Sequence, residues 1–367
     1  TDFIPGHPFV NTPLSIPEWT RVLEKKHLTI PEMLKEHGYV SAHLGKWHLA
    51  HRDGYSHGGE DNPDPDNHPE AHGFDINVGG CEKGAPPSYF WPYGRGKTLE
   101  EKKNNTIYET LPRDDTPEEE REGEYLTDRL AAEAEILLDR FAEEKTPFFL
   151  NFSFYNVHTP LMGRPDLVEK YEEKLATDPN RKHTNVKYAA MVESVDEAVG
   201  RVVARLREHE LWDETLIVFT SDNGACFEWD PFGFDIKSSN QNILHRGKQL
   251  DAMGGPGTFH SVGSGWANAS NTPFRLYKHF AHEGGAATPF FMHWPAGIAP
   301  RKDWFGEPAQ LIDIMPTLLD VAGAKYPDNA HGNEIPPLDG ISLRPAFAGS
   351  SLNRRDPIFI EHENNAF

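Results

Sequence analysis

Strand-like apolar runs that alternate with helical segments constrain the fold of this 367-residue chain most strongly. The runs of strand length cover residues 39–44, 147–154, 215–220 and 288–294, and one more begins at 357–361. The segments with helical patterns cover residues 29–37, 124–143, 186–209 and 310–321. Alternation of this kind predicts an α/β fold with a mostly parallel central sheet and helices on both faces.

Three of the helical segments carry specific signals. In the first, Thr29 is a suitable N-cap, Pro31 lies in the first turn, and Gly38 follows as a stop. In the second, the apolar face consists of Leu126, Leu130, Ala134, Leu137 and Phe141. In the third, the apolar stripe consists of Val192, Val195, Val199, Val202 and Leu206. Stripes with this spacing normally face the core.

Two long stretches lack such patterns. Residues 52–123 are dense in Asp, Asn, Pro, Gly and His, and residues 226–272 are rich in Gly and Asn. We expect both to be mostly loops, which commonly determine specificity. The tryptophans in them either stack on a sugar or an aryl ring or pack the loops together. They are Trp91, Trp229 and Trp266.

Composition limits the class of partner. The formal net charge of −21 repels nucleic acid and anionic membrane surfaces, so neither is an expected partner. The sequence contains no run of 18 or more apolar residues, so no membrane-spanning helix is predicted. The two cysteines, Cys81 and Cys226, form either one disulfide or two buried thiols, and we expect the second arrangement. The sequence gives no information on the oligomeric state.

Polar clusters follow three of the predicted strands. Residues 45–48 read Gly-Lys-Trp-His, residues 156–160 read Asn-Val-His-Thr-Pro, and residues 221–224 read Ser-Asp-Asn-Gly. In parallel sheets, sites form outside the carboxyl ends of the strands, so we expect the three clusters along one edge. Taken singly, each cluster is an ordinary surface, strand-end or turn sequence. Their joint placement after separate strands favours a functional site.

The residue types in and near these clusters suit a particular chemistry. Asp222 and Asn223 offer oxygen ligands, which hard cations such as calcium or magnesium prefer. Two lysines could hold a tetrahedral anion, and two histidines could donate hydrogen bonds to it or transfer a proton to a leaving oxygen. These side chains are Lys46, Lys278, His48 and His158. Such a set suits the cleavage of an ester of a strong oxyacid.

Glycines at the turns near these side chains allow tight backbone paths and close approach to a ligand. They are Gly45, Gly224, Gly284 and Gly285.

Six motifs, in order along the chain, resemble the signature of the sulfatase family. They are Gly-Lys-Trp-His-Leu at 45–49, Gly-Phe-Asp at 73–75, Pro-Phe-Phe-Leu and His-Thr-Pro between 147 and 160, Thr-Ser-Asp-Asn-Gly at 220–224, Lys278 with His-Glu-Gly-Gly at 282–285, and Asp-x-x-Pro-Thr at 313–317. The resemblance extends over residues 28 to 362.

The resemblance implies an alkaline-phosphatase-like fold and hydrolysis of aryl or carbohydrate sulfate esters. It also implies one divalent cation, usually calcium, with Asp222 and Asn223 as half of its protein ligands. The groups implied to bind sulfate or the catalytic aldehyde hydrate are Lys46, His48, His158 and Lys278. The expected partner is a small-molecule or glycan sulfate ester, and the expected location is the periplasm or the cell exterior.

The family nucleophile is a formylglycine made from Cys or Ser in a Cys/Ser-x-Pro-x-Arg motif. That motif and two Asp metal ligands are expected upstream of Gly-Lys-Trp-His, and the sequence contains neither. Ser15 is followed by Ile-Pro-Glu-Trp, without the Arg, and both Cys81 and Cys226 lack the Pro. We therefore assign no nucleophile. We expect residues 1–350 to be a catalytic core without its N-terminal part, and residues 351–367 to begin an incomplete C-terminal subdomain.

Two alternative functions remain open at this stage. A phosphoester or phosphonate hydrolase of the same fold would use a similar anion site, although Asn223 stands where two-metal enzymes usually need His. A non-catalytic relative would bind sulfated glycans without turning them over.

Overall fold

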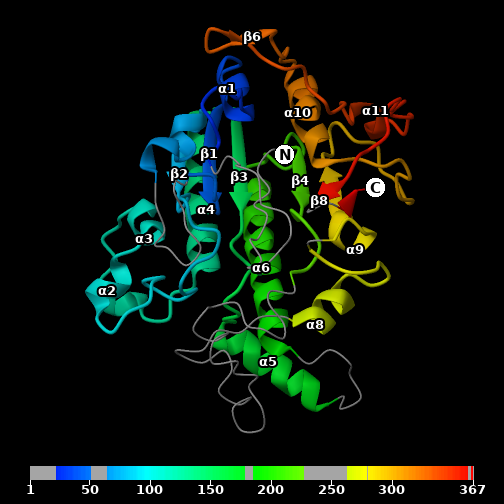
Figure 1. The fold of residues 1–367 in the computed structure, drawn as a ribbon. Coiled ribbons are helices and arrows are strands. Elements are labelled where there is room, and N and C mark those ends of the chain that lie inside the picture. The colour runs from blue at the N-terminus through cyan, green and yellow to red at the C-terminus, as the bar shows by residue number, and fades with distance from the viewer. Residues whose placement is uncertain are drawn as a thin grey trace, which may run out of the picture.

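A parallel three-stranded sheet forms the centre of the protein (Figure 1). The computed structural model describes residues 22–50, 64–177, 185–226, 263–278, 280–362 and 365–366. The sheet has the order β2-β1-β3, with β1 at Val40–Gly45, β2 at Ile76–Val78 and β3 at Phe148–Ser153. Both pairings of β1 are parallel, which confirms the predicted mostly parallel α/β architecture.

A second pair of strands is antiparallel. β4 (Ile217–Thr220) pairs with β5 (Phe290–His293), so Thr220 lies opposite Phe290. The arrows of β3 and β4 point the same way in Figure 1, so the carboxyl ends of these two strands lie toward the same side of the molecule. Both strands are half-buried along their length.

The remaining strands contain two residues each. They are β6 (Asn329–Ala330), β7 (Asn333–Glu334), β8 (Glu361–His362) and β9 (Asn365–Ala366). The prediction of a strand at residues 357–361 is therefore wrong for residues 357–360, and only residue 361 lies in a strand.

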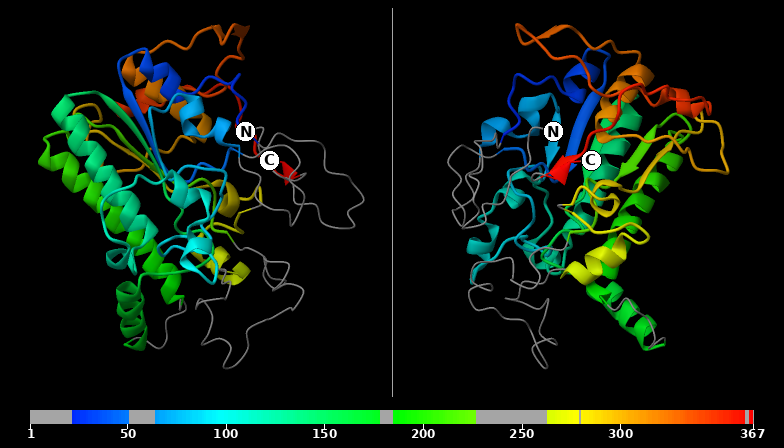
Figure 2. Two further views of the ribbon diagram at one scale, coloured as in Figure 1. Left: turned by 90° about the vertical axis from the view of Figure 1, so that its left-hand side faces the viewer. Right: turned by 45° about the vertical axis from the view of Figure 1, so that its right-hand side comes forward.

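Helices cover both faces of the strands, as predicted. Figure 2 shows the long helices α4 and α6 on one face and α1 and α10 on the other. The described α-helices are α1 (Ile30–Lys35), α2 (Leu99–Lys103), α3 (Thr106–Thr110), α4 (Leu126–Glu144), α5 (Pro165–Ala176), α6 (Val186–Glu208), α8 (Gly263–Ser270), α9 (Glu283–Ala286), α10 (Ile314–Ala322) and α11 (Arg344–Phe347). Short 3-10 turns lie at Pro65–Asn67, Pro69–His72, Glu118–Arg121 and Leu311–Asp313.

The predicted start and end of α1 are confirmed. The backbone N–H of Thr29 donates to the Glu32 carboxylate at 2.8 Å, which satisfies one of the donors that helix starts leave unpaired. Pro31 lies in the first turn, and Gly38 beyond the helix has φ of +80°, a conformation that favours glycine.

The apolar face of α4 is confirmed. The stripe assigned to α6 is partly correct, because Leu206 is buried and Val202 packs against the core, whereas the other predicted valines are not buried. The five predicted residues of α4 are all buried. In α6, Val192 is 46% exposed, and the buried positions are Ala190, Met191, Ser194, Ala198 and Leu206. The small side chains of Ser194 and Ala198 allow α6 to pack closely, and hydrophobicity alone favoured the larger valines beside them.

The described part of residues 52–123, which is 64–123, is mostly loop and turn as predicted, but much of it is buried rather than at the surface. This part contains β2, α2 and α3, and several of its apolar side chains enter the main core. These side chains, at most 6% exposed, are Val78, Cys81, Tyr89, Tyr93, Ile107 and Leu111. They are scattered between Pro and Gly without a period of two or 3.6, so the sequence pattern carried no signal for them.

The tryptophans of the predicted loops have different outcomes. Trp91 is half-buried, and the Lys103 ammonium lies 5.5 Å from its ring centroid, so it packs within the protein. Trp229 and the side chain of Trp266 lie outside the described residues. In the second predicted loop stretch, residues 263–270 form α8 instead.

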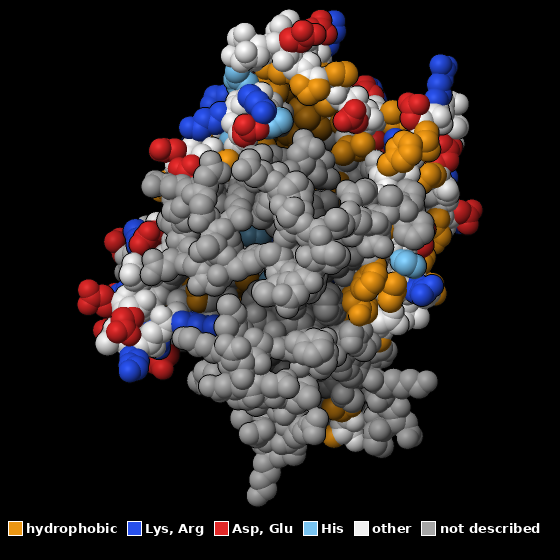
Figure 3. Space-filling view, viewed as in Figure 1, with side chains coloured by type: hydrophobic (Ala, Val, Ile, Leu, Met, Phe, Trp, Pro, Cys, Tyr) orange, Lys and Arg blue, Asp and Glu red, His pale blue; other side chains and the backbone are white. Residues whose placement is uncertain are grey.

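Acidic and basic side chains lie side by side on the edge formed by α2 and α3, at the left of Figure 3. Ion pairs there join Lys103 to Glu118 and Arg121 to Asp114. Cys81 and Cys226 are separate thiols, as expected, with Cys81 buried and Cys226 half-buried. Among the described residues, no helix is both long and apolar enough to cross a membrane.

His43 is a buried polar residue at the centre of β1. It is 1% exposed, and its ring contacts those of Trp47 and Phe74, with centroids 5.3 and 5.4 Å away. Its Nδ1 lies 3.0 Å from the Asn151 amide nitrogen, and its Nε2 lies 3.2 Å from the Gly45 carbonyl oxygen. These partners fit a neutral ring that carries its proton on Nε2. Burial lowers the pKa of His43 to about 4.

The Asp-x-x-Pro-Thr motif ties α10 to the chain that follows it. The Asp313 carboxylate is fully buried, pairs with Arg354, and accepts hydrogen bonds from the backbone N–H groups of Gln310 and Ile341. The Thr317 hydroxyl donates to the Asp313 carbonyl at 2.6 Å. This motif of the family signature therefore has a structural role.

Acidification should destabilise the fold through His43. The folded-state pKa lies below the ordinary value of 6.5, so the unfolded chain binds more protons, and stability falls as the pH drops from about 6.5 toward 4. The shift corresponds to a loss on the order of 3 kcal/mol. When the free energy of unfolding is measured with denaturant at pH 7 and pH 4.5, its decrease at the lower pH should be smaller for His43→Gln than for wild type. Equal losses would contradict this assignment.

Removing the Asp313 carboxylate should destabilise the protein strongly. In Asp313→Ala, the Arg354 side chain, which is 14% exposed, loses its buried partner, and we expect a cost of about 3–5 kcal/mol in denaturant unfolding. The matched control is Asp320→Ala, because Asp320 pairs with Arg344 at the surface and should cost about 1 kcal/mol or less. Similar costs for the two variants would refute the structural role of the motif.

Candidate active site

The cluster after β1 begins with a glycine that the neighbouring strand requires. Gly45 has φ of +88°, and a Cβ there would lie 2.0 Å from the carbonyl oxygen of Ser153 in β3. The next residue, Lys46, donates its backbone N–H to the same oxygen at 2.8 Å. Only glycine fits this close approach. Lys46, the next residue, therefore lies at the carboxyl end of β1.

The Trp47 indole fixes the chain between Lys46 and His48. Its Nε1–H donates to the Asn67 carbonyl at 3.0 Å, and its ring contacts Phe74 and His43 edge-on. The adjacent Asp75 accepts bonds from the Ser41 backbone and the Lys35 ammonium, so the Gly-Phe-Asp element packs beside β1. The aromatic contacts therefore hold the base of the Lys-Trp-His segment.

His48 is exposed and rests on the loop after β2. Its φ of +61° is unusual for a residue other than glycine. Its backbone N–H donates to the Cys81 carbonyl at 2.8 Å, and a Cβ at Gly84 would lie 2.5 Å from Cε1 of its ring. The loop from Cys81 to Gly84 thus forms one wall around His48.

The Cys81 thiol in that wall is not suited to act as a nucleophile. It is fully buried, and burial together with the neighbouring Glu82 raises its pKa to about 12. The thiol is therefore protonated at neutral pH.

His158 lies beyond the end of β3, on a turn held by two buried tyrosines. The Tyr89 hydroxyl lies 2.7 Å from the Tyr155 carbonyl and 2.9 Å from the His158 carbonyl. Tyr155 in turn donates its hydroxyl to the Gly79 carbonyl at 2.9 Å, which connects this turn to the loop beside His48. The Nδ1 of His158 lies 3.1 Å from the Thr159 carbonyl, which orients the ring.

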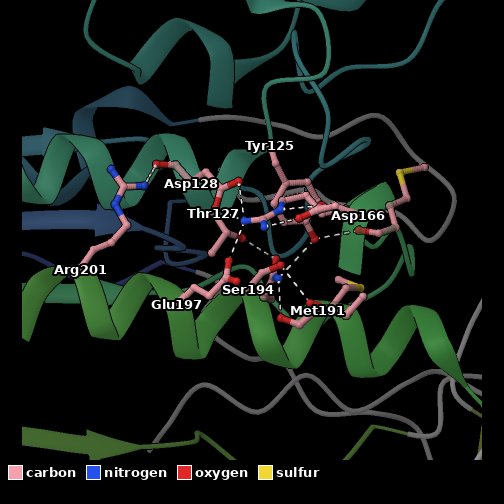
Figure 4. A network of polar contacts seen from close by, with 12 residues as sticks. Tyr125, Thr127, Asp128, Asp166, Met191, Ser194, Glu197 and Arg201 are labelled. Carbon is pink, nitrogen blue, oxygen red and sulfur yellow. Dashed lines mark hydrogen bonds and ion pairs between the residues drawn. The ribbon is translucent and has the colours of Figure 1, made fainter. Parts of the chain in front are cut away.

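A network of polar contacts anchors the His158 segment to α4 and α6 (Figure 4). The Asn156 side chain accepts from Thr127 of α4 at 2.8 Å and donates to the Met191 carbonyl of α6 at 3.0 Å. At the other end of the segment, the Arg164 guanidinium bonds to Asp128, Asp166 and Glu197 at 3.2, 2.7 and 2.7 Å. The long helices thus fix both ends of the His158 turn.

Asp222 and Asn223 follow β4. Asp222 is exposed, and among the described residues no hydrogen bond or ion pair engages its carboxylate. The Asn223 amide nitrogen donates to the Gly224 carbonyl at 2.9 Å, so its nitrogen is held by the backbone while Oδ1 serves as an acceptor. A carboxylate and a carboxamide oxygen on adjacent residues fit a hard cation such as calcium, of whose six to eight oxygen ligands they would supply two.

Glycines bring the Asp222 segment against the turn that carries Lys278. A Cβ at Gly224 would lie 1.7 Å from the Gly284 carbonyl oxygen, so no other residue fits. Gly224 donates to the Gly285 carbonyl at 3.1 Å, and the backbone N–H of Lys278 donates to the Ala225 carbonyl at 3.0 Å. The predicted role of these glycines in tight backbone approach is confirmed.

The structure thus places the predicted site residues in two groups. Lys46, His48 and His158 follow the adjacent parallel strands β1 and β3, whereas Asp222, Asn223 and Lys278 share one hydrogen-bonded unit after β4. Chain neighbours of both groups pack against one hydrophobic core; these are Val157, Ala225 and Tyr277. Within the described ranges, no three His, Cys, Asp or Glu side chains cluster as metal ligands. The meeting of the two groups at one anion remains a prediction.

Sequence reasoning missed the residues that hold these groups in place. Tyr89, Tyr155 and Asn156 act through hydrogen bonds to backbone carbonyls and to side chains of distant segments. Tyr89 lies in a stretch predicted to be loop, and no local pattern indicates which carbonyl a hydroxyl reaches. A buried tyrosine hydroxyl normally needs a partner, which is the only general signal available.

Comparison with known proteins identifies the family. The sulfatase family model, described as "Sulfatase", matches residues 5–324. The chain is 29% identical over 343 residues to N-acetylgalactosamine-6-sulfatase of Canis lupus familiaris, covering 92% of this chain and 51% of that protein. It is 29% identical over 398 residues to steryl-sulfatase of Mus musculus, covering 94% of this chain and 54% of that protein.

A solved structure is also similar to this chain. The structure of Ps i-CgsB in complex with k-i-k-neocarrahexaose matches with a TM-score of 0.62 and 29% identity, over 93% of this chain and 63% of that one. The chain spans about half the length of the curated relatives it matches. With a family model that covers most of its residues, the chain belongs to the sulfatase family.

Proposed function

We propose that this chain forms the core of an enzyme that hydrolyses sulfate esters. The observation that carries the proposal is the backbone arrangement. Lys46 and His48 follow β1, His158 follows the parallel strand β3, and the backbone N–H of Lys278 donates to the carbonyl of Ala225, two residues after Asn223. Family membership supports the same reaction. Cations arranged in advance around developing negative charge are usually the largest catalytic contribution.

Each group has a role that follows from its chemistry. The ammonium groups of Lys46 and Lys278 hold the sulfate oxygens, and the imidazoles of His48 and His158 donate hydrogen bonds and pass a proton to the leaving oxygen. Asp222 and Asn223 would hold a divalent cation, which we propose to be calcium; when bound, the cation stabilises negative charge on the sulfate group. Sulfatases use a formylglycine nucleophile, and this chain contains no residue that we assign to it.

The substrate class is a sulfated small molecule or glycan. The complex of Ps i-CgsB with k-i-k-neocarrahexaose supports the glycan class. The names of two relatives, N-acetylgalactosamine-6-sulfatase and steryl-sulfatase, support a sugar and a small-molecule substrate respectively. We further propose that residues 1–350 form the catalytic core and that the protein acts in the periplasm or outside the cell, in keeping with the family resemblance.

An assay of the full-length gene product tests the reaction. After formylglycine maturation, we expect kcat/KM for 4-nitrophenyl sulfate to exceed that for 4-nitrophenyl phosphate, because Asn223 stands where two-metal phosphoester hydrolases usually need His. A preference for phosphate would favour a phosphoester hydrolase. Tight binding of sulfated oligosaccharides with no turnover of either ester would favour a non-catalytic binding protein.

Replacement of Asp222 tests the proposed cation ligand. We expect Asp222→Ala to weaken calcium binding in titration calorimetry and to lower kcat at least about 100-fold, since the charge-stabilising cation is lost. Asp115→Ala is a suitable control, because Asp115 is also exposed but lies in the loop before α4. Normal turnover of Asp222→Ala in calcium-depleted buffer would refute the ligand assignment.

A further inference from the structure

A side chain outside every motif of the sequence fixes the turn that carries Lys278. Asn271 follows α8 and is half-buried. Its Nδ2 donates to the Leu276 carbonyl at 2.8 Å and to the Gly284 carbonyl at 2.7 Å, and its Oδ1 accepts from the Ala225 backbone N–H at 3.1 Å. One carboxamide therefore joins three separate segments of the chain.

These segments are the ones that carry the proposed ligands. Ala225 lies two residues after Asn223, and Leu276 lies two residues before Lys278. The backbone N–H of Lys278 also donates to the Ala225 carbonyl at 3.0 Å. Asn271 thus lies at the junction between the proposed cation ligands and the proposed anion-binding lysine.

The backbone at Leu276 needs support from its surroundings. Its φ of +66° lies in the left-handed region, which is unfavourable for a side chain such as leucine. Asn268 accepts from the Leu276 N–H at 2.9 Å, and Asn271 binds its carbonyl. Unfavourable conformations of this kind persist where the structure around them determines the path, and they gather at functional sites.

We propose that Asn271 is a positioning residue that holds Lys278 beside Asp222 and Asn223. The inference rests on the proposed function in one respect, the role of Lys278 in binding the substrate anion. Without the carboxamide, the 271–284 turn loses its ties to both the Ala225 and the Gly284 segments, and Lys278 moves away from the cation ligands. Displacements of about 1 Å can lower a rate by up to about 100-fold, because charge stabilisation depends on distance.

Asn271→Asp is the most informative substitution. The carboxylate has the same shape and still accepts from Ala225, but it cannot donate to the Leu276 and Gly284 carbonyls, and it repels them. We expect kcat for 4-nitrophenyl sulfate to fall on the order of 10- to 100-fold.

Asn105 provides a matched control. Its side chain also makes three bonds to the backbone, donating to the Pro92 and Lys102 carbonyls and accepting from the Tyr108 N–H, at the start of α3. Asn105→Asp should therefore lower the melting temperature at least as much as Asn271→Asp while it leaves kcat within about twofold of wild type.

A double-mutant cycle with Lys278→Ala separates positioning from general destabilisation. If Asn271 acts through Lys278, the effect of Asn271→Asp on kcat disappears in the Lys278→Ala background, whereas independent effects would multiply. Hydrogen exchange gives a second readout, since the amides of Lys278 and Gly224 should lose protection in Asn271→Asp but not in Asn105→Asp.

The outcomes distinguish this inference from the proposed function. If the wild-type protein does not hydrolyse sulfate esters, the proposed function is wrong. Hydrogen exchange at the Lys278 and Gly224 amides then still tests whether Asn271 holds the Lys278 turn in place. If the wild type is active, multiplicative effects in the cycle, kcat within about twofold in Asn271→Asp, or unchanged exchange at both amides would overturn the positioning role. Non-additivity together with lost protection would support it.

Discussion

The parallel pairing of β1 with β3 is the constraint on which the rest of the site depends. Because the two strands run in register from Val40 opposite Phe148 to Gly45 opposite Ser153, they end at the same level. The segments that follow them then leave the sheet together, one with Lys46 and His48 and the other with His158. A shift of the register by one residue would turn every side chain of β1 to the other face and separate these groups.

Close backbone approach also fixes both groups of site residues. Gly45 and Gly224 each lie where a Cβ would collide with a carbonyl oxygen of a neighbouring segment. Backbone hydrogen bonds therefore form directly between the neighbouring segments at these two glycines, and they fix the segments that carry the functional side chains. Buried polar side chains complete the arrangement: Tyr89 binds the His158 turn, and Asn271 binds the Lys278 turn.

The sequence allowed the architecture and the candidate residues to be predicted, because apolar runs and polar strand ends are local patterns. The face of α4 followed from spacing alone, whereas α6 packs on Ser194 and Ala198, which a search for large apolar residues passes over. The core side chains of residues 64–123 have no period, so their burial depends on tertiary packing. Hydrogen bonds from Asn271 and Tyr89 to distant carbonyls likewise depend on the finished fold, and no local pattern indicates them.

The central claim is that the two groups of side chains meet around one sulfate beside one cation. A crystal structure of the full-length protein soaked with calcium and inorganic sulfate tests it most directly. We expect sulfate oxygens at about 2.7–3.2 Å from nitrogens of Lys46, His48, His158 and Lys278. We also expect a calcium ion at about 2.3–2.6 Å from oxygens of Asp222 and Asn223. Sulfate bound away from these side chains, or calcium held by other residues, would contradict it.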